Sequence, residues 1–148
     1  MGSSDDRHDV INAFRFSVEI DGMIVAGFSH ASGIEMEILT TELKEGGLNE
    51  YTRKIVIGTK YSPIVLKKGI TTSNFFGSWC QAIASGYITR KDGAIILIGP
   101  DGQEFRRWNF VEAYPTKWTG PELDSMTPNV AFESVTLTHN GIKVVKSK

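Results

Sequence analysis

The fold is decided by the stretch Phe14-Arg15-Phe16-Ser17-Val18-Glu19-Ile20-Asp21-Gly22. Apolar and polar residues alternate strictly from Phe14 to Ile20, which places the apolar set on one face of a β-strand. Asp21-Gly22 follows directly, and this pair favours a tight two-residue turn because both positions tolerate a positive φ. The stretch therefore predicts a β-hairpin whose second strand covers residues 23–31.

Further strands are predicted along the rest of the chain. They cover residues 34–38, 54–58, 63–68, 94–99, 104–114, 130–139 and 142–145. Pro100-Asp101-Gly102 and Asn140-Gly141 supply turn residues. The apolar parity shifts between Phe132 and Val135, which predicts a β-bulge. Residues 114–126 are rich in turn-forming residues and are predicted to lie outside the strands.

One helix is predicted, over residues 71–84. Thr72 or Ser73 can cap its N-terminus, and Gly86 stands close beyond its C-terminus. Its apolar face at helical spacing consists of Phe75, Phe76, Trp79, Cys80 and Ile83. The predicted fold class is therefore mainly antiparallel β with one α-helix packed on it.

Length and charge narrow the functional classes. The chain has 148 residues, the size of one domain, and its 16 basic and 17 acidic residues give a formal net charge of -1. This balance argues against a general binder of nucleic acid or membrane surfaces, which carries a basic excess. No apolar run approaches the roughly 18 residues that span a bilayer. We predict a polar N-terminal arm, residues 1–11, that is not a signal peptide, and a single β domain, residues 12–148.

Catalytic and ligand-binding patterns are missing from the sequence. His8, His30 and His139 lie far apart without metal-ligand spacing. Cys80 lies on the apolar helix face with no adjacent base, which indicates a small core residue rather than a nucleophile. The glycine pairs are typical of turns and not of phosphate-binding loops. We therefore predict no catalytic residues, no cofactor and no metal site.

The stretch from Leu39 to Arg53 is unusual, because it is too polar to bury and is long for a connection in a compact domain. A flexible surface loop and an interface are both compatible with its residues. Opposite charges in it could set the register between two molecules, although exposed ion pairs contribute only about 0.2–1 kcal/mol each.

The order of the elements resembles the tail tube proteins of contractile phages and the inner-tube proteins of related contractile injection systems. The residues that carry the resemblance are 14–20, Gly27-Phe28, 32–35, Glu45-Gly46-Gly47, 64–70, Phe76, Trp79, 108–110, 113–115 and 133–137. The resemblance covers residues 11 to 145 and extends to the haemolysin-coregulated tube protein of type VI secretion. It implies a small antiparallel β-barrel or sandwich with one flanking helix.

The resemblance also implies a function: a structural, non-enzymatic subunit of homohexameric rings that stack helically into the inner tube of a contractile tail. Sheath contraction drives such a tube through a target envelope. Implied partners are other copies of the chain, the contractile sheath, baseplate and tube-initiator proteins, tape-measure and tube-terminator proteins, and a protein or DNA cargo in the lumen. The implied location is a virion or injection particle assembled in the bacterial cytoplasm, without a membrane anchor.

The family's long loop between early strands reaches the adjacent ring, and it corresponds here to the stretch from Leu39 to Arg53. The implied inter-ring residues are Glu42, Lys44, Glu45, Gly46, Gly47, Asn49, Glu50 and Arg53. Two alternatives lie within the family, a baseplate tube initiator and a second tube paralogue. Outside it, the alternatives are a small β-barrel ligand-binding module or a flavin enzyme, which need a concave site with convergent polar groups.

Overall fold

The computed structural model describes residues 15–44, 52–71, 73–126 and 131–145. Ten strands and one helix lie within these ranges, and the antiparallel β architecture with one flanking helix is confirmed. The strands are β1 (Arg15–Ile20), β2 (Met23–Phe28), β3 (His30–Ser32), β4 (Met36–Lys44), β5 (Thr52–Tyr61), β6 (Ile64–Gly69), β7 (Lys91–Ile98), β8 (Glu104–Thr119), β9 (Phe132–Thr138) and β10 (Ile142–Val145). The helix is α2 (Phe75–Ala84). The predicted N-terminal arm lies outside the described residues.

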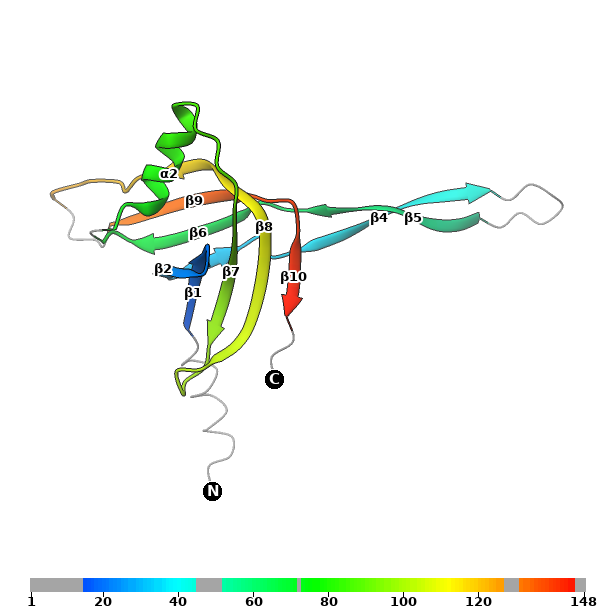
Figure 1. Cartoon of the computed structure of the whole chain (residues 1–148), viewed down its shortest axis with the longest axis horizontal. Helices are drawn as coiled ribbons and strands as arrows, with labels where there is room; N and C mark the ends of the chain where they lie inside the picture. The colour runs from blue at the N-terminus through cyan, green and yellow to red at the C-terminus, as the bar shows by residue number, and fades with distance from the viewer. Residues whose placement is uncertain (1–14, 45–51, 72, 127–130, 146–148) are drawn as a thin grey trace, which may run out of the picture.

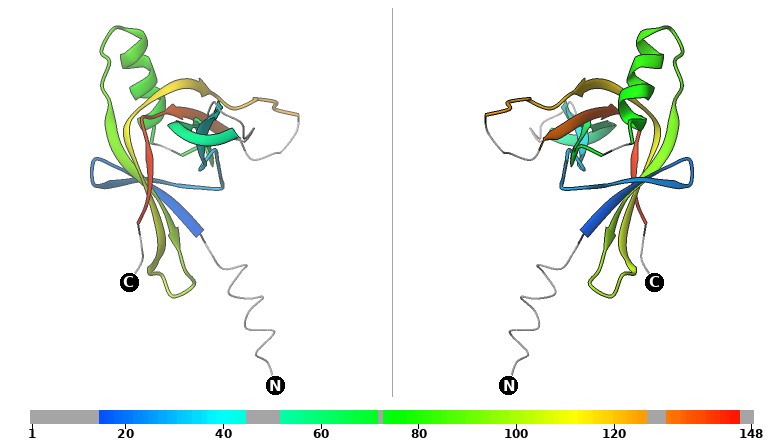
Figure 2. Two further views of the ribbon diagram at one scale, coloured as in Figure 1. Left: turned by 90° about the vertical axis from the view of Figure 1, so that its right-hand side faces the viewer. Right: turned by 90° about the vertical axis from the view of Figure 1, so that its left-hand side faces the viewer.

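Eight strands form one curved sheet in the order β2-β1-β7-β8-β9-β6-β3, with β10 added beside β8 (Figures 1 and 2). Strand β8 has 16 residues and is curved, so it takes part in both halves of the sheet. Its first part pairs with β7 and β10, and its last part, from Tyr114 to Thr119, pairs with β9. The two ends of this strand order, β2 and β3, are consecutive in the chain, although β2 pairs with β1 and β3 pairs with β6. The short connection between them brings the two ends of the sheet together, so the sheet curls into a barrel.

The β1–β2 hairpin is confirmed with its predicted turn. Asp21 and Gly22 have φ values of 52° and 80°, and Ile20 pairs with Met23 across the turn. Positive φ at both central residues twists the turn in the same sense as the strands that it joins. The predicted second strand is divided, because β2 ends at Phe28 and β3 begins at His30 on the other side of the barrel.

The core fills the space between the curved sheet and α2. Its fully buried side chains include Val18, Ile64, Leu66, Phe76, Ile95, Phe110 and Leu137. Phe76 and Trp79 are the buried residues of α2, so the predicted helix face is confirmed. The predicted cap is wrong: Asn74 occupies the N-cap position and makes no capping hydrogen bond with its side chain, while Thr72 lies outside the described residues.

Three other predictions need correction. Residues from Tyr114 to Thr119 continue β8 rather than forming turns, because they pair with β9. Asn140-Gly141 does not reverse the chain, since β9 and β10 both run antiparallel to β8. Between β9 and β10, the Val111 C=O accepts a hydrogen bond from Asn140 N–H, and the Val111 N–H donates one to Gly141 C=O. These bonds hold the connecting residues beside β8, so that β9 pairs with the last part of β8 and β10 pairs with the first part.

The predicted bulge in residues 130–139 is also wrong. The pairing of β9 with β6 runs without a shift from Phe132 to Leu137. Phe132 is exposed, and Glu133 occupies the buried position that the pattern reserves for an apolar residue. A register shift exists instead in β8, between Pro115 and Lys117.

Candidate functional site

Strands β4 and β5 form a two-stranded sheet of their own, which projects far beyond the barrel (Figure 1). We call this element, Met36–Lys44 and Thr52–Tyr61, the projecting hairpin. The predicted irregular connection from Leu39 to Arg53 is therefore corrected, because pairing continues to Lys44 and Thr52. The β-branched residues of both strands, among them Thr40, Thr41 and the run Ile55-Val56-Ile57, favour this extended pairing.

The projecting hairpin exposes apolar side chains on both faces. All nine residues of β4 are exposed, and Ile38, Leu39 and Leu43 are among them. On β5, the side chains of Val56 and Ile57 are 66% and 63% exposed. The ladder skips Ile57, since Leu39 pairs with Gly58 and Thr40 with Val56. An isolated two-stranded hairpin is marginally stable in water, so this element is suited to pack against another molecule.

Opposite charges face each other across the projecting hairpin. Glu37 pairs in register with Lys60, and Glu42 pairs with Lys54. Directly opposite residues share a face, and each such charge pair contributes about 0.2–1 kcal/mol relative to alanines. The two pairs therefore support the β4–β5 register while their charged groups remain exposed.

The structure brings some of the predicted interface residues together and leaves others undescribed. Glu42, Lys44 and Arg53 lie on the outer half of the projecting hairpin, where Arg53 pairs with Leu43. Glu45, Gly46, Gly47, Asn49 and Glu50 lie outside the described residues. Ile38, Val56 and Ile57 are exposed apolar residues that were not among the predicted interface residues. The run Ile55-Val56-Ile57 was the available signal, because a consecutive apolar run cannot be buried on one face of a two-stranded hairpin.

Hydrogen bonds fix the base of the projecting hairpin to the barrel. Ser62 donates from its hydroxyl to the Glu35 carboxylate. His139 is buried, its Nε2 lies 2.9 Å from Ser62 O, and its Nδ1 accepts the Gly141 N–H at 3.1 Å. Because Nδ1 accepts, the ring proton lies on Nε2 and is donated to Ser62. Gly33 has φ +85° and approaches the Pro63 carbonyl so closely that an added Cβ would lie 1.9 Å from its oxygen.

The candidate residues for chemistry do not converge among the described residues. His30 is exposed on β3, whereas His139 is buried in the hydrogen bonds described above, and His8 lies in the part of the chain that is not described. No group of three potential metal ligands occurs in the described ranges. Cys80 is partly buried on α2.

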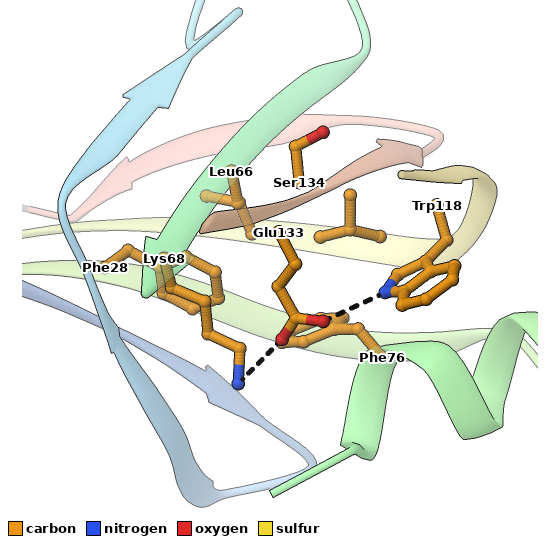
Figure 3. A pocket seen from close by; sticks show the side chains of 8 residues that line it. Phe28, Leu66, Lys68, Phe76, Trp118, Glu133 and Ser134 are labelled. Atoms are coloured by element: carbon orange, nitrogen blue, oxygen red, sulfur yellow. Dashed lines mark hydrogen bonds and ion pairs between the residues drawn. The ribbon is translucent and has the colours of Figure 1, made fainter. Parts of the chain in front are cut away.

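A buried ion pair lies between the barrel and α2 (Figure 3). Lys68 Nζ lies 3.1 Å from Glu133 Oε1, and the two side chains are 4% and 8% exposed. The second carboxylate oxygen of Glu133 accepts the indole N–H of Trp118 at 3.1 Å. The space among these residues leaves no room for a water molecule, so the charges stabilise each other and do not form a ligand site. The sequence offered a signal for this ion pair, because Lys68 and Glu133 occupy positions that alternate in step with the buried apolar residues of their strands.

An open groove of about 680 Å³ runs beside α2. The described residues that line it include Gly77, Ser78, Cys80, Gln81, Tyr87 and Trp118, and none of the described lining residues is charged. The titratable side chains among these described lining residues are Cys80 and Tyr87, and no carboxylate, imidazole or amine lies with them.

A second polar cluster lies on the barrel. Arg107 donates to the carboxylates of Glu104 and Glu19. The hydrogen bond to Glu104 is the first cause, and that to Glu19 the second, of an Arg107 pKa raised above its ordinary value. Both carboxylates thus bind a permanent cation, which makes the cluster a connection between β1 and β8.

The described residues contain no helix that is long and apolar enough to cross a membrane.

Comparisons with known proteins agree with this architecture. A comparison with curated protein sequences found no match to this chain. The fold is similar to that of a chain in the PVC sheath-tube complex of an extracellular contractile injection system in the extended state. That match has a TM-score of 0.78 and 24% identity, and it covers 90% of this chain and 89% of that one. A chain of the anti-feeding prophage tube-terminating cap has a TM-score of 0.79 and 27% identity, with the same coverage of 90% and 89%.

A more distant fold neighbour is Hcp1 from Flavobacterium johnsoniae, with a TM-score of 0.58 and 18% identity over 88% of this chain and 94% of that one. The model of the family described as T4-like virus tail tube protein gp19 matches residues 12–143. This match spans nearly the whole chain and includes the barrel, α2 and the projecting hairpin, so the chain belongs to the T4-like virus tail tube protein family.

Proposed function

We propose that this protein is the structural subunit of the inner tube of a contractile injection system or phage tail, in which hexameric rings stack into a hollow conduit. The observation that carries the proposal is the projecting hairpin: a tail-tube barrel extends a two-stranded element with apolar side chains on both faces. Such an element is stabilised when it packs on a neighbour. The role is mechanical and not catalytic.

Free sheet edges support ring formation. Among the described residues, β2 pairs only with β1 on one side of the barrel, and β10 pairs only with β8 on another side. An unpaired strand edge tends to pair with another chain. Because the two edges belong to different surfaces, their contact is heterologous and repeats until a ring closes.

Stacking of the rings is assigned to the projecting hairpin. We propose that the adjacent ring is contacted by Glu42, Lys44, Glu45, Gly46, Gly47, Asn49, Glu50 and Arg53. The exposed side chains of Ile38, Val56 and Ile57 add apolar area to this contact. The charges fix the register, whereas the apolar residues supply most of the free energy of association.

The proposed partners follow from this role. They are the contractile sheath around the tube, the baseplate and tube initiator at one end, and the tube terminator and tape-measure protein at the other or inside. The lumen carries a protein effector or DNA, and the assembled location is the particle. The sheath, the baseplate and the tube terminator are proposed because the similar solved structures include chains of sheath–tube, baseplate and tube-terminator assemblies.

Negative-stain electron microscopy of the purified protein over a concentration series tests the proposal. Hollow tubes with six-fold end views are expected, and open-ended growth distinguishes a tube subunit from a tube initiator. The variant Val56→Asp/Ile57→Asp should keep the circular dichroism spectrum of the wild type and lose the tubes. The matched control Tyr87→Asp changes an exposed aromatic residue away from the projecting hairpin and should assemble normally. Normal tubes from the Val56→Asp/Ile57→Asp variant would exclude the projecting hairpin as the stacking contact.

A further inference from the structure

The loop that follows β8, residues 120–126, is the most exposed apolar feature of the described chain. Leu123 and Met126 are 81% and 88% exposed, the highest values among the large hydrophobic residues of the described ranges. The Met126 N–H donates to the Asp124 carboxylate at 2.9 Å, which gives this end of the loop a defined turn. Glu122 and Asp124 flank Leu123, so the loop presents an apolar centre with acidic neighbours.

The projecting hairpin presents a complementary pattern. Val56 and Ile57 form an apolar centre, and exposed Lys54 and Lys60 lie on either side of it along β5. The described residues of the projecting hairpin carry four basic and two acidic side chains, a formal charge of +2, whereas the loop carries two acidic ones. Opposite charges around two apolar centres favour association in one orientation.

The two surfaces cannot meet within one molecule. The 120–126 loop lies at the end of the molecule opposite to the projecting hairpin (Figure 1). A contact between them therefore joins two copies head to tail. Such a heterologous contact is the kind that closes rings or extends filaments.

We infer that the 120–126 loop of one subunit is the docking surface for the projecting hairpin of a second copy of this chain. Leu123 and Met126 pack against Val56 and Ile57, and the acidic residues of the loop lie beside the lysines of β5. The inference rests on the proposed function and adds a named receiving surface to it.

Intermolecular cross-linking tests the inference in assembled protein. Val56→Cys and Leu123→Cys are made in separate chains that also carry Cys80→Ala. The two chains are mixed, assembled, checked by electron microscopy and treated with a short bismaleimide. A covalent dimer is expected in the mixture and not with either chain alone. The matched control replaces Leu123→Cys by Tyr87→Cys, which lies on another exposed surface.

A charge reversal supplies an independent measurement. Glu122→Lys should raise the concentration needed for assembly about tenfold, because it places like charges together at the contact. Combining it with Lys54→Glu and Glu42→Lys in the same chain should restore most of the loss, because this pair of changes reverses the charge that faces the loop and keeps opposite charges across β4 and β5. Assembled particles whose dimer yield equals that of the Tyr87→Cys control would overturn the inference and leave the proposed function standing. A wild-type protein that forms neither rings nor tubes would overturn both.

Discussion

The buried pair of Lys68 and Glu133 allows a quantitative test of the packing between β6, β9 and α2. Lys68→Met keeps the length of the side chain and removes its charge, so the Glu133 carboxylate stays buried with Trp118 as its remaining partner. Breaking a buried pair from one side costs about 3–5 kcal/mol. The lower end applies here, about 3 kcal/mol, because the indole N–H still donates to the carboxylate.

The assay is urea unfolding of unassembled protein at low concentration, followed by circular dichroism and tryptophan fluorescence. With a slope of about 2 kcal/mol per molar urea, the midpoint should fall by about 1.5 M. The double variant Lys68→Met/Glu133→Leu should recover most of this loss, because a buried ion pair replaced by apolar residues is often neutral or stabilising.

Lys67→Met is the matched control, because Lys67 is exposed on the same strand, and it should change stability by less than about 0.5 kcal/mol. A Lys68→Met variant as stable as this control would refute the argument that the pair is buried and coupled. A double variant less stable than the single one would refute the argument that the unpaired charge causes the loss.

Three further predictions concern the barrel and the base of the projecting hairpin. Gly33→Ala should prevent folding or lower stability by more than about 3 kcal/mol, because it combines a positive φ with a collision against the Pro63 carbonyl; Gly22→Ala, with open space around it, should lose only about 1–3 kcal/mol in the same urea assay. Arg107→Met should lower stability by about 1–2 kcal/mol through two lost charge-assisted hydrogen bonds, and a loss below that of Lys67→Met would contradict the cluster described for Glu19 and Glu104. His139→Phe should cost about 1–3 kcal/mol, since Gly141 N–H and Ser62 C=O lose their partner, and faster amide exchange at Gly141, measured by NMR, should accompany it.

Local patterns in the sequence predicted those elements whose residues interact with close neighbours in the chain. The β1–β2 turn at Asp21-Gly22 depends on two adjacent φ values, and the apolar face of α2 depends on helical spacing. Both were confirmed because no distant contact competes with them.

Features that depend on distant contacts were missed or misassigned. Glu133 appeared to interrupt the apolar phase of its strand, because its partner Lys68 is brought opposite only by the β6–β9 register. Asn140-Gly141 appeared to be a reversal, because its hydrogen bonds with Val111 are visible only in the folded chain. The strands of the projecting hairpin were assigned partly to a loop, since neither of their faces is buried and no alternation marks them. The inter-ring roles of Glu42, Lys44 and Arg53 remain predictions.

The long strand β8 has a consequence for how the chain folds during synthesis. The projecting hairpin pairs residues that are close in sequence, and such hairpins form in about 1–10 μs. The barrel instead needs β1 to meet β7, and β6 to meet β9, across long intervals of chain, and non-local pairing of this kind is slow. Until β9 and β10 have left the ribosome, one edge of β8 has no partner, and β6 lacks the neighbouring strand β9 with which it pairs. A nascent chain therefore contains both strands of the projecting hairpin before its core can close. Because an isolated two-stranded hairpin is only marginally stable in water, this element is held in place only after the barrel has closed and His139 has bound Ser62.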